Sequence, residues 1–325
     1  MPAIGNGIGL PFLKGGGGAP SPNPDFVSVW DTTKAGSASD TVVLPLLSYG
    51  TYSGTVDWGD GTTSPFDYAN RTHVYASSGI YTITISDYSN NNIGAWRFQN
   101  GGDKLKIIEI TNWGLFDFAF TSFNYQAFRG CKNLNITATD IPVISGLSLD
   151  GCFNDCDAFN NVSFSGWDVS NIANFSDIFY GNGGTYSGLD TWDVSSATNF
   201  FRAFFGASVY DDISGWDVSN VTNMSQMFYG NGALNCDLAS WNIVNVSNFA
   251  NFMIYKSVWS TVNYDATLIG WEATLQAAYP SGVCYPHTIN IHFGGSHYTA
   301  GGAADTARTS LISNFGWTIT DGGSV

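Results

Sequence analysis

Between residues 91 and 262, hydrophobic and polar positions repeat with a period of 24 or 25 residues. The four clear copies each begin at a tryptophan: WDVSNIANFSDIF from Trp167, WDVSSATNFFRAF from Trp192, WDVSNVTNMSQMF from Trp216 and WNIVNVSNFANFM from Trp241. Apolar residues first alternate with polar ones, which predicts a short strand, and then recur every three to four residues, which predicts one or two turns of helix. One such unit is too small to bury its apolar face alone. Neighbouring units must therefore stack, and the pattern predicts a solenoid.

Residues 26–90 carry a different pattern, in which short apolar segments are separated by tight turns. Tyr81, Ile83 and Ile85 alternate with polar residues, as expected for a strand with one face on a core. The glycines of DWGDGTT, residues 57–63, permit the positive φ angles of a hairpin turn. These signals predict a small β-sandwich, and the segment KLKIIEITNWG at residues 104–114 predicts the first strand of the repeats against it.

Two regions resemble known families. DWGDGTT followed by HVYASSGIYTITI at residues 73–85 resembles the PKD domain, which implies an immunoglobulin-like sandwich that acts as a spacer or adhesion module. WDVSNVTNMSQMF and its copies resemble the BspA-like leucine-rich repeats of bacterial surface proteins, which implies a leucine-rich-repeat-like solenoid on a cell or particle surface, often linked to adhesion. Phe175 and Phe200 stand where the commoner pattern has Met, so the resemblance leaves the ligand open.

The two ends of the chain differ from the repeats. Residues 1–25 are rich in Gly and Pro, which predicts either a disordered tail or an arm that becomes ordered on a larger assembly. Residues 263–325 predict two helices and two strands, which we interpret as a cap over the open end of the solenoid. The expected fold is therefore mainly β with short helices. It consists of a PKD-like sandwich over residues 26–90, a BspA-like α/β solenoid over 91–262 and an α/β cap over 263–325.

Composition and charge narrow the classes of function. Charged residues make up 11% of the 325 residues, and the net charge is −15. Soluble domains typically contain ~25% charged residues. An acidic surface repels phosphate backbones and anionic membranes, so we expect no nucleic-acid binding. No apolar run is long enough for a transmembrane helix, and the first residues lack the basic start of a secretory signal peptide.

Candidate metal ligands are few. Asp57 and Asp60 are expected either to hold turn amides or to bind calcium, the one cofactor considered for this chain. His287, His292 and His297 are five residues apart, a spacing that places neighbours on opposite faces of a strand and disfavours a metal trio.

The five cysteines form no CxxC pair. Cys131 and Cys156 lie one period apart, so they are predicted to be either buried filler or a bridge between successive units.

Paired carboxylates are the remaining candidates for chemistry. Asp211 and Asp212 are adjacent, and a column of aspartates recurs with the repeat; either set could supply a glycosidase pair. Because the column of Asp168, Asp193 and Asp217 follows from the repeat itself, we expect these side chains to accept hydrogen bonds from turn and cap amides. The chain has no P-loop, G-x-S-x-G or HExxH motif, so no catalytic residues are predicted and no enzyme is expected.

The leading hypothesis is a non-enzymatic, surface-exposed binding or attachment protein. The missing export signal and the Gly-rich start favour a bacteriophage virion protein, in a tail or head appendage. Residues 1–25 would dock on other virion proteins, and the rest would contact a glycan or protein of the host surface. The alternatives are a bacterial cell-surface adhesin, a decoration protein without a receptor, and an enzyme acting on surface polysaccharide.

Recurring residues are expected to build the scaffold, so recognition is predicted at positions that vary between copies. Examples are Tyr186, Arg202, Tyr210 and Gln226. The sequence leaves the ligand and the oligomeric state open.

Overall fold

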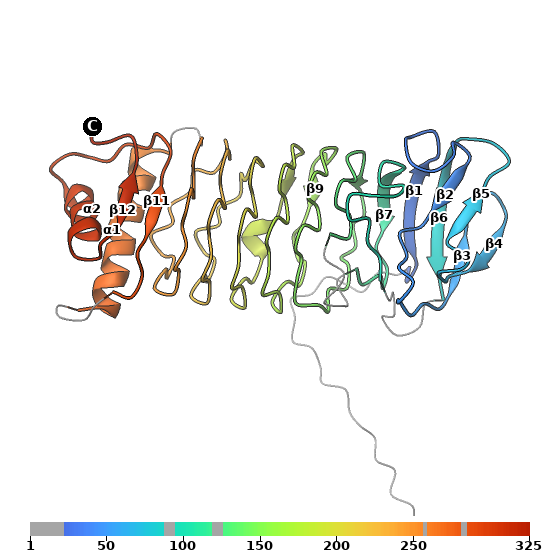
Figure 1. The fold of residues 1–325 in the computed structure, drawn as a ribbon, viewed down its shortest axis with the longest axis horizontal. Coiled ribbons are helices and arrows are strands. Elements are labelled where there is room, and N and C mark those ends of the chain that lie inside the picture. The colour runs from blue at the N-terminus through green and yellow to red at the C-terminus, as the bar shows by residue number, and fades with distance from the viewer. Residues whose placement is uncertain (1–22, 88–94, 119–125, 256–258, 281–284) are drawn as a thin grey trace, which may run out of the picture.

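The computed structural model describes five segments of the chain: residues 23–87, 95–118, 126–255, 259–280 and 285–325. They form an elongated, mainly β molecule in which strand-rich layers lie at one end, a row of coils fills the middle, and helices lie at the other end (Figure 1). One hydrophobic core cluster includes residues from all three parts. The predicted N-terminal arm lies outside the described residues, apart from residues 23–25.

The N-terminal part contains two sheets. The larger has the strand order β4-β3-β6-β1-β7-β8, and the smaller pairs β2 with β5. The strands are β1 (Phe26–Asp31), β2 (Thr41–Val43), β3 (Thr55–Asp57), β4 (Thr63–Pro65), β5 (Thr72–Val74), β6 (Ile80–Ser86), β7 (Ile107–Asn112) and β8 (Asn135–Ile136). In β6, Ile83 and Ile85 are buried while Tyr81 is half-buried, so the predicted alternation places one face of this strand on the core.

The larger sheet continues from the N-terminal strands into the coils. β1 pairs antiparallel with β6 on one side and with β7 on the other, and β7 then pairs parallel with β8. The prediction of a first repeat strand against the N-terminal sheet, within residues 104–114, is confirmed. One sheet therefore contains strands from both sides of the predicted boundary at residue 90, and a division into separate domains there stays a prediction.

A column of asparagines holds successive coils in register. Parallel bridges connect one residue of each coil to the next, through Ser148, Asn174, Asn199, Asn223 and Asn248. The side-chain oxygen of each asparagine accepts a hydrogen bond from the backbone N–H two residues on, at 3.0 to 3.1 Å. Such local bonds fix the turn that follows each bridge.

The second half of each repeat, which was predicted to be helical, consists of turns. Asp177 and Gly181 have left-handed φ angles of 54° and 66°, and the same two positions recur in the neighbouring coils. The N–H of Asp177 bonds to the carbonyl of Phe201 at 2.9 Å, so the donor is paired with the next coil instead of with a residue one helical turn back. The predicted repeat helix is therefore wrong. The only helical segment between residues 126 and 255 is the short η1 (Leu189–Thr191).

The paired strands of the coils lie just before the tryptophans. β9 (Val162–Ser163) and β10 (Tyr186–Ser187) pair parallel, whereas the segment from Trp167 to Val169 belongs to no strand. Its side chains nevertheless alternate as predicted, because Trp167 and Val169 are buried and Asp168 is exposed.

Aromatic rings stack from coil to coil in the core. Successive centroids are 5.7, 5.9, 5.8 and 5.6 Å apart along the column Phe128, Phe153, Phe179, Phe204 and Phe228. The interplanar angles between successive rings are 3°, 13°, 21° and 8°, so each ring stacks on the next.

The repeat tryptophans also donate hydrogen bonds between coils. The indole N–H of Trp192 donates to the carbonyl of Phe164 at 3.0 Å, and that of Trp216 donates to Leu189 at 2.9 Å. Trp241 donates in the same way to Ile213, at 3.1 Å. Each indole therefore fills the core and satisfies a backbone carbonyl of the preceding coil.

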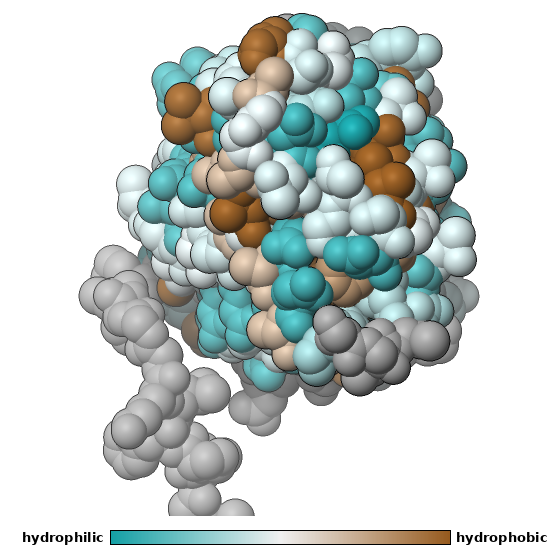
Figure 2. Space-filling view, turned by 90° about the vertical axis from the view of Figure 1, so that its left-hand side faces the viewer, coloured by the Kyte–Doolittle hydropathy of each residue, from teal (hydrophilic) through white to brown (hydrophobic). Residues whose placement is uncertain are grey.

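The C-terminal part has the helices and strands that the sequence predicts. They are α1 (Thr261–Ala278), β11 (Asn290–His292), α2 (Ala303–Ser313) and β12 (Thr318–Thr320), with β11 and β12 paired parallel. The indole N–H of Trp271 in α1 donates to the carbonyl of Leu238 at 2.8 Å, which continues the pattern of the repeat tryptophans. Figure 2 looks onto this end and shows apolar groups separated by polar ones. Within the described segments, no helix combines the length and the apolar character needed to cross a membrane.

Candidate functional site

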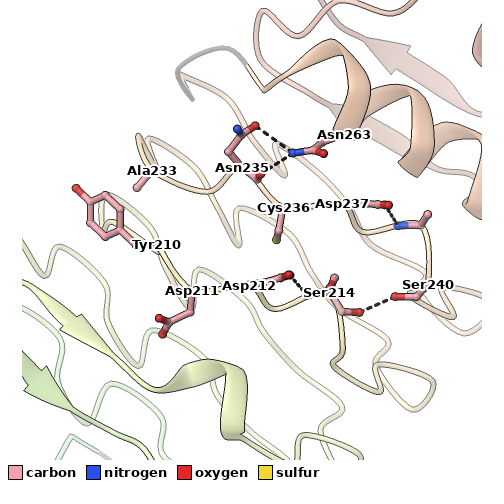
Figure 3. A pocket seen from close by; sticks show the side chains of 11 residues that line it. Tyr210, Asp211, Asp212, Ser214, Ala233, Asn235, Cys236, Asp237, Ser240 and Asn263 are labelled. Atoms are coloured by element: carbon pink, nitrogen blue, oxygen red, sulfur yellow. Dashed lines mark hydrogen bonds between the residues drawn. The ribbon is translucent and has the colours of Figure 1, made fainter.

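A surface pocket of about 670 Å³ lies where the loops of two successive coils meet the start of α1 (Figure 3). One coil contributes Tyr210, Asp211 and Asp212, the next contributes Asn235 and Asp237, and α1 contributes Asn263. The residues therefore come from three separate segments that only the stacking of coils brings together.

Hydrogen bonds within the loops fix several of the lining side chains. Asp212 accepts a bond from the backbone N–H of Ser214 at 3.0 Å, and Asp237 accepts one from Ala239 at 2.6 Å. Asn235 accepts a bond from the N–H of Ser260, the residue that caps α1, at 3.0 Å. The pocket walls are thus held by turn and cap geometry, which leaves the shape of the pocket largely set before any ligand binds.

Asp211 is a carboxylate of the pocket whose pKa is raised. Partial burial raises its pKa above the usual value of 3.8, and the N–H of Leu189, which donates to it at 2.9 Å, offsets only part of that rise. The nearby charge of Asp190 raises the pKa further. Asp211 therefore takes up a proton at a higher pH than an unperturbed aspartate does, and its protonated form can donate a hydrogen bond.

The chemical character of the pocket is polar and acidic, with one aromatic side chain at its margin. Tyr210 is 71% exposed, and no Lys or Arg lines the pocket. Burial raises the pKa of the Cys236 thiol to about 11, so this residue stays protonated and is a poor nucleophile. Carboxylates without a cation repel anionic ligands, whereas carboxylate, amide and hydroxyl groups suit a ligand rich in hydroxyls.

The coils that carry this pocket match a known family. A family model described as a Mycoplasma protein of unknown function, DUF285, matches residues 100–210 and 147–267. Together the two matches span more than half of the 325 residues. The chain belongs to the DUF285 family. No curated protein and no solved structure matches it. The match covers most of the predicted repeats at residues 91–262 and is consistent with a BspA-like surface protein.

The recurring aspartates of the DUF285 repeats hold turns, as predicted. Asp168, Asp193 and Asp217 accept bonds from the N–H of the serine two residues on, at 3.2, 3.0 and 3.0 Å. The hydroxyl and the N–H of Ser219 lower the pKa of Asp217 below its usual value. These carboxylates are thus occupied by local hydrogen bonds in each unit.

The four variable residues predicted for recognition fall in three different places. Tyr210 lines the pocket, and Arg202 and Gln226 lie together in a column of left-handed turns. Tyr186 is a correction, because it is only 5% exposed and its ring stacks on Phe179 with centroids 4.7 Å apart. Its position in β10 turns it toward the core, which disfavours contact with a partner.

Asp57 is the last residue of β3, and Asp60 lies in the turn between β3 and β4. Asp57 accepts a bond from the N–H of Gly59 at 2.9 Å, and Asp60 accepts bonds from the N–H and hydroxyl of Thr62 at 3.0 and 2.6 Å. Burial alone would raise the pKa of Asp60, but these bonds and the His73 imidazole at 2.8 Å lower it to about 2. Both carboxylates hold the turn, and calcium binding by them stays a prediction.

The other candidate metal ligands do not form a site either. Across the described part of the chain, no three His, Cys, Asp or Glu side chains are placed to hold a metal ion, so His287, His292 and His297 form no such group. Cys131 and Cys156 are free buried thiols, which corrects the bridge alternative; Cys284 lies outside the described residues.

Sequence reasoning missed most of the pocket residues. Asn235, Asp237 and Asn263 were not predicted, although Asp237 follows Asp212 by 25 residues, one repeat period. Residues one period apart lie on adjacent coils. That spacing is the signal that could have placed Asp237 beside the Asp211–Asp212 pair.

Proposed function

We propose that this DUF285 protein is a non-enzymatic, surface-exposed attachment protein that binds an uncharged glycan of a host surface in the pocket beside Tyr210. The observation that carries the proposal is that different residues of each coil build the fold and line the pocket. The recurring Trp, Phe, Asn and Asp side chains are engaged in core packing and turns. Tyr210, Asp211 and Asn235 of the pocket come from the loops that connect successive coils and that differ between units, and Asn263 comes from α1.

The chemistry of the pocket supports a glycan over a charged ligand. An exposed tyrosine ring offers an apolar face to a sugar ring, and the neighbouring carboxylates and amides can bond its hydroxyls. The net charge of −15 and the absence of Lys and Arg from the pocket disfavour phosphate-rich or uronic polymers.

The proposed architecture is a PKD-like sandwich followed by a BspA-like leucine-rich-repeat solenoid and a C-terminal cap. The WGDG-type turn between β3 and β4 supports the first assignment. The parallel bridges between successive asparagines and the DUF285 match support the second. In this architecture the elongated solenoid would hold the pocket at a distance from the surface to which the N-terminal end is attached.

We place the protein on a bacteriophage virion, in a tail or head appendage, with residues 1–25 as the docking arm. The Gly- and Pro-rich composition of these residues supports this proposal. A bacterial cell-surface adhesin is the alternative location, and it would use the pocket in the same way.

A polysaccharide-acting enzyme is the second candidate function. Asp211 favours it, because a carboxyl whose pKa is raised can serve as a general acid. In that case the purified protein would release reducing sugar from a bound polysaccharide, and Asp211→Asn would abolish the release while leaving binding in place.

Binding of the purified protein to a panel of neutral and anionic bacterial surface polysaccharides tests the proposal. We expect saturable binding to a neutral polysaccharide, at least tenfold weakening by Tyr210→Ala, and no change with Tyr49→Ala, an exposed tyrosine (60%) in the N-terminal part. Equal binding by all three proteins would exclude the pocket as the glycan site. Binding only to anionic polymers would contradict the ligand class.

A further inference from the structure

Aromatic rings form a row from coil to coil outside the core. The rings of Tyr180 and Phe205 stack with centroids 4.7 Å apart, and those of Phe205 and Tyr229 stack with centroids 4.3 Å apart. The row ends at Tyr255, whose ring centroid lies 5.3 Å from that of Tyr229. The three inner rings are half-buried, because each stacks on a neighbour.

The last ring of this row is turned relative to the others. The planes of the Tyr255 and Tyr229 rings make an angle of 84°, whereas those of Phe205 and Tyr229 make an angle of 6°. An edge-to-face contact covers at most one face of a ring, and Tyr255 is 77% exposed. Tyr255 therefore presents an aromatic face to the solvent.

Tyr255 occupies a backbone position where the preceding coils have glycine. Its φ angle is 59°, and Gly206 and Gly230 have φ angles of 66° and 68° at the equivalent position. The N–H of each glycine bonds to the carbonyl of the residue before that position in the next coil, which for Gly230 is Ile254. Tyrosine is strained in this left-handed region, and its ring is too exposed for core packing to explain its presence. Strained residues of this kind are typical of sites that contact a ligand.

Tyr255 and Tyr210 lie in the coils after and before the same loop. They are the two most exposed aromatic residues of the described segments, at 77% and 71%. On one side of the loop, the N–H of Gly230 bonds at 2.7 Å to the carbonyl of Ile254, the residue before Tyr255. On the other side, Ala233 lines the pocket together with Tyr210 (Figure 3). Ala233 follows Gly230 by three residues, so these two backbone positions are at most about 11 Å apart.

We propose that the glycan site continues from the pocket across this loop to Tyr255. It would bind a chain of several sugar units, in which one ring stacks on Tyr210 and a later ring stacks on Tyr255. This inference rests on the proposed function, because it takes a neutral polysaccharide as the ligand of the pocket. Gly232 and Ala233, which lie in the loop between the two tyrosines, carry no bulky side chain that would block a ligand.

Two aromatic faces at a fixed separation favour a long ligand over a short one. Each ring can stack on a sugar only if the chain reaches it, and the second contact adds to the affinity of a ligand that the first already holds. A disaccharide in the pocket would contact Tyr210 alone. The site therefore predicts recognition of polysaccharide chains rather than of single sugars.

Binding of glycan fragments of different length tests the proposal. The neutral polysaccharide that the wild type binds is cut into fragments from disaccharide to octasaccharide, and their affinities are measured by isothermal titration calorimetry. For the wild type we expect the affinity to rise at least tenfold from the disaccharide to the octasaccharide. Tyr255→Gly should bind the octasaccharide at least fivefold more weakly than the wild type and the disaccharide equally well. Tyr210→Ala should weaken the binding of every fragment.

Two further variants of the chain serve as controls. Tyr255→Phe keeps the ring and should bind the octasaccharide within twofold of the wild type. Tyr49→Ala removes an exposed tyrosine of the N-terminal part and should leave all affinities unchanged. Tyr255→Gly itself restores the residue that the other coils have at this position, so we expect it to fold, and circular dichroism checks this.

Two outcomes would overturn this inference while the proposed function stands. One is an octasaccharide affinity that Tyr255→Gly leaves unchanged, and the other is a wild-type affinity that requires Tyr210 but does not depend on fragment length. A wild type that binds no neutral polysaccharide would overturn both proposals. A dimer in sedimentation velocity that Tyr255→Gly abolishes would also overturn the inference, because it would assign the exposed ring to a contact between copies of the chain.

Discussion

Trp216 and Tyr210 lie six residues apart in the same coil, but the Trp216 side chain is buried and the Tyr210 side chain is exposed. The Trp216 indole is buried, stacks on Trp241 with centroids 6.4 Å apart, and donates to the carbonyl of Leu189. The Tyr210 ring is mostly exposed and stands at the margin of the pocket. The coil uses its recurring residue to join its neighbours, and its non-recurring residue remains available to a ligand.

Specificity in a stacked array can arise at positions that the neighbouring coils do not constrain. A recurring position must satisfy the coil before it and the coil after it, so its side chain has little freedom to change. In a loop that connects two coils, only the backbone and the turn residues, such as Asp212 and Asp237, are constrained in this way. The loop side chains that point outward are therefore free to vary with the ligand.

The largest effect is expected from Trp216→Ala. The substitution removes a buried indole and its inter-coil hydrogen bond, so the free energy of unfolding should fall by about 3–5 kcal/mol. Urea denaturation followed by tryptophan fluorescence and circular dichroism measures it. A loss below ~1 kcal/mol would mean that the recurring tryptophans are not the main connection between coils.

A smaller effect is expected in the asparagine column. Asn223→Ala removes the oxygen that accepts from the N–H of Ser225 at 3.0 Å, and it should lower the free energy of unfolding by about 1 kcal/mol. Asn223→Asp retains the acceptor and is the matched control. If both variants lose the same amount of stability, the side-chain amide group, and not the hydrogen bond within the turn, would explain why asparagine recurs at this position.

The smallest expected effect is on the pH dependence of stability. It distinguishes Asp217, which recurs in the repeats, from Asp211, which lines the pocket. The folded-state pKa of Asp217 is lowered, so its contribution to stability is present above the usual value of 3.8 and is lost as the pH falls through the folded pKa. The folded-state pKa of Asp211 is raised, so its ionised form destabilises the fold above that pKa and stability is recovered as the pH falls.

Asp217→Asn and Asp211→Asn should therefore shift stability in opposite directions at neutral pH. We expect the first to be slightly less stable than the wild type and the second slightly more stable, with both differences disappearing in strong acid. Urea midpoints between neutral and acidic pH measure this. Shifts of the same sign in the two variants would show that the aspartates are not held in different environments.

Local sequence patterns predicted the side of the chain that each residue faces. The alternation of Ile83 and Ile85, and of Trp167 and Val169, appears in the structure because burial in a short segment depends only on adjacent residues. The C-terminal helices were predicted for the same reason, since Leu268, Trp271 and Leu275 recur on one face of α1.

Features that depend on the next coil were missed or assigned wrongly. A helical spacing at Phe175 and Ile178 predicted a helix. The N–H groups of Phe175, Asp177 and Phe179 instead bond to carbonyls of the following coil, and no local pattern reveals that competition. Tyr186 was expected on the surface because it varies between copies, yet variation and exposure are separate properties. The pocket joins Tyr210 to Asn235 and Asn263, and only the stacked structure places these residues together.

The most direct test of the account measures stability and glycan affinity on the same variant, Tyr210→Ala. If recurring residues build the coils and pocket residues bind, its free energy of unfolding should stay within about 0.5 kcal/mol of the wild type while its affinity for the neutral polysaccharide falls at least tenfold. A variant that loses several kcal/mol of stability, or that binds as tightly as the wild type, would contradict the division between scaffold and site.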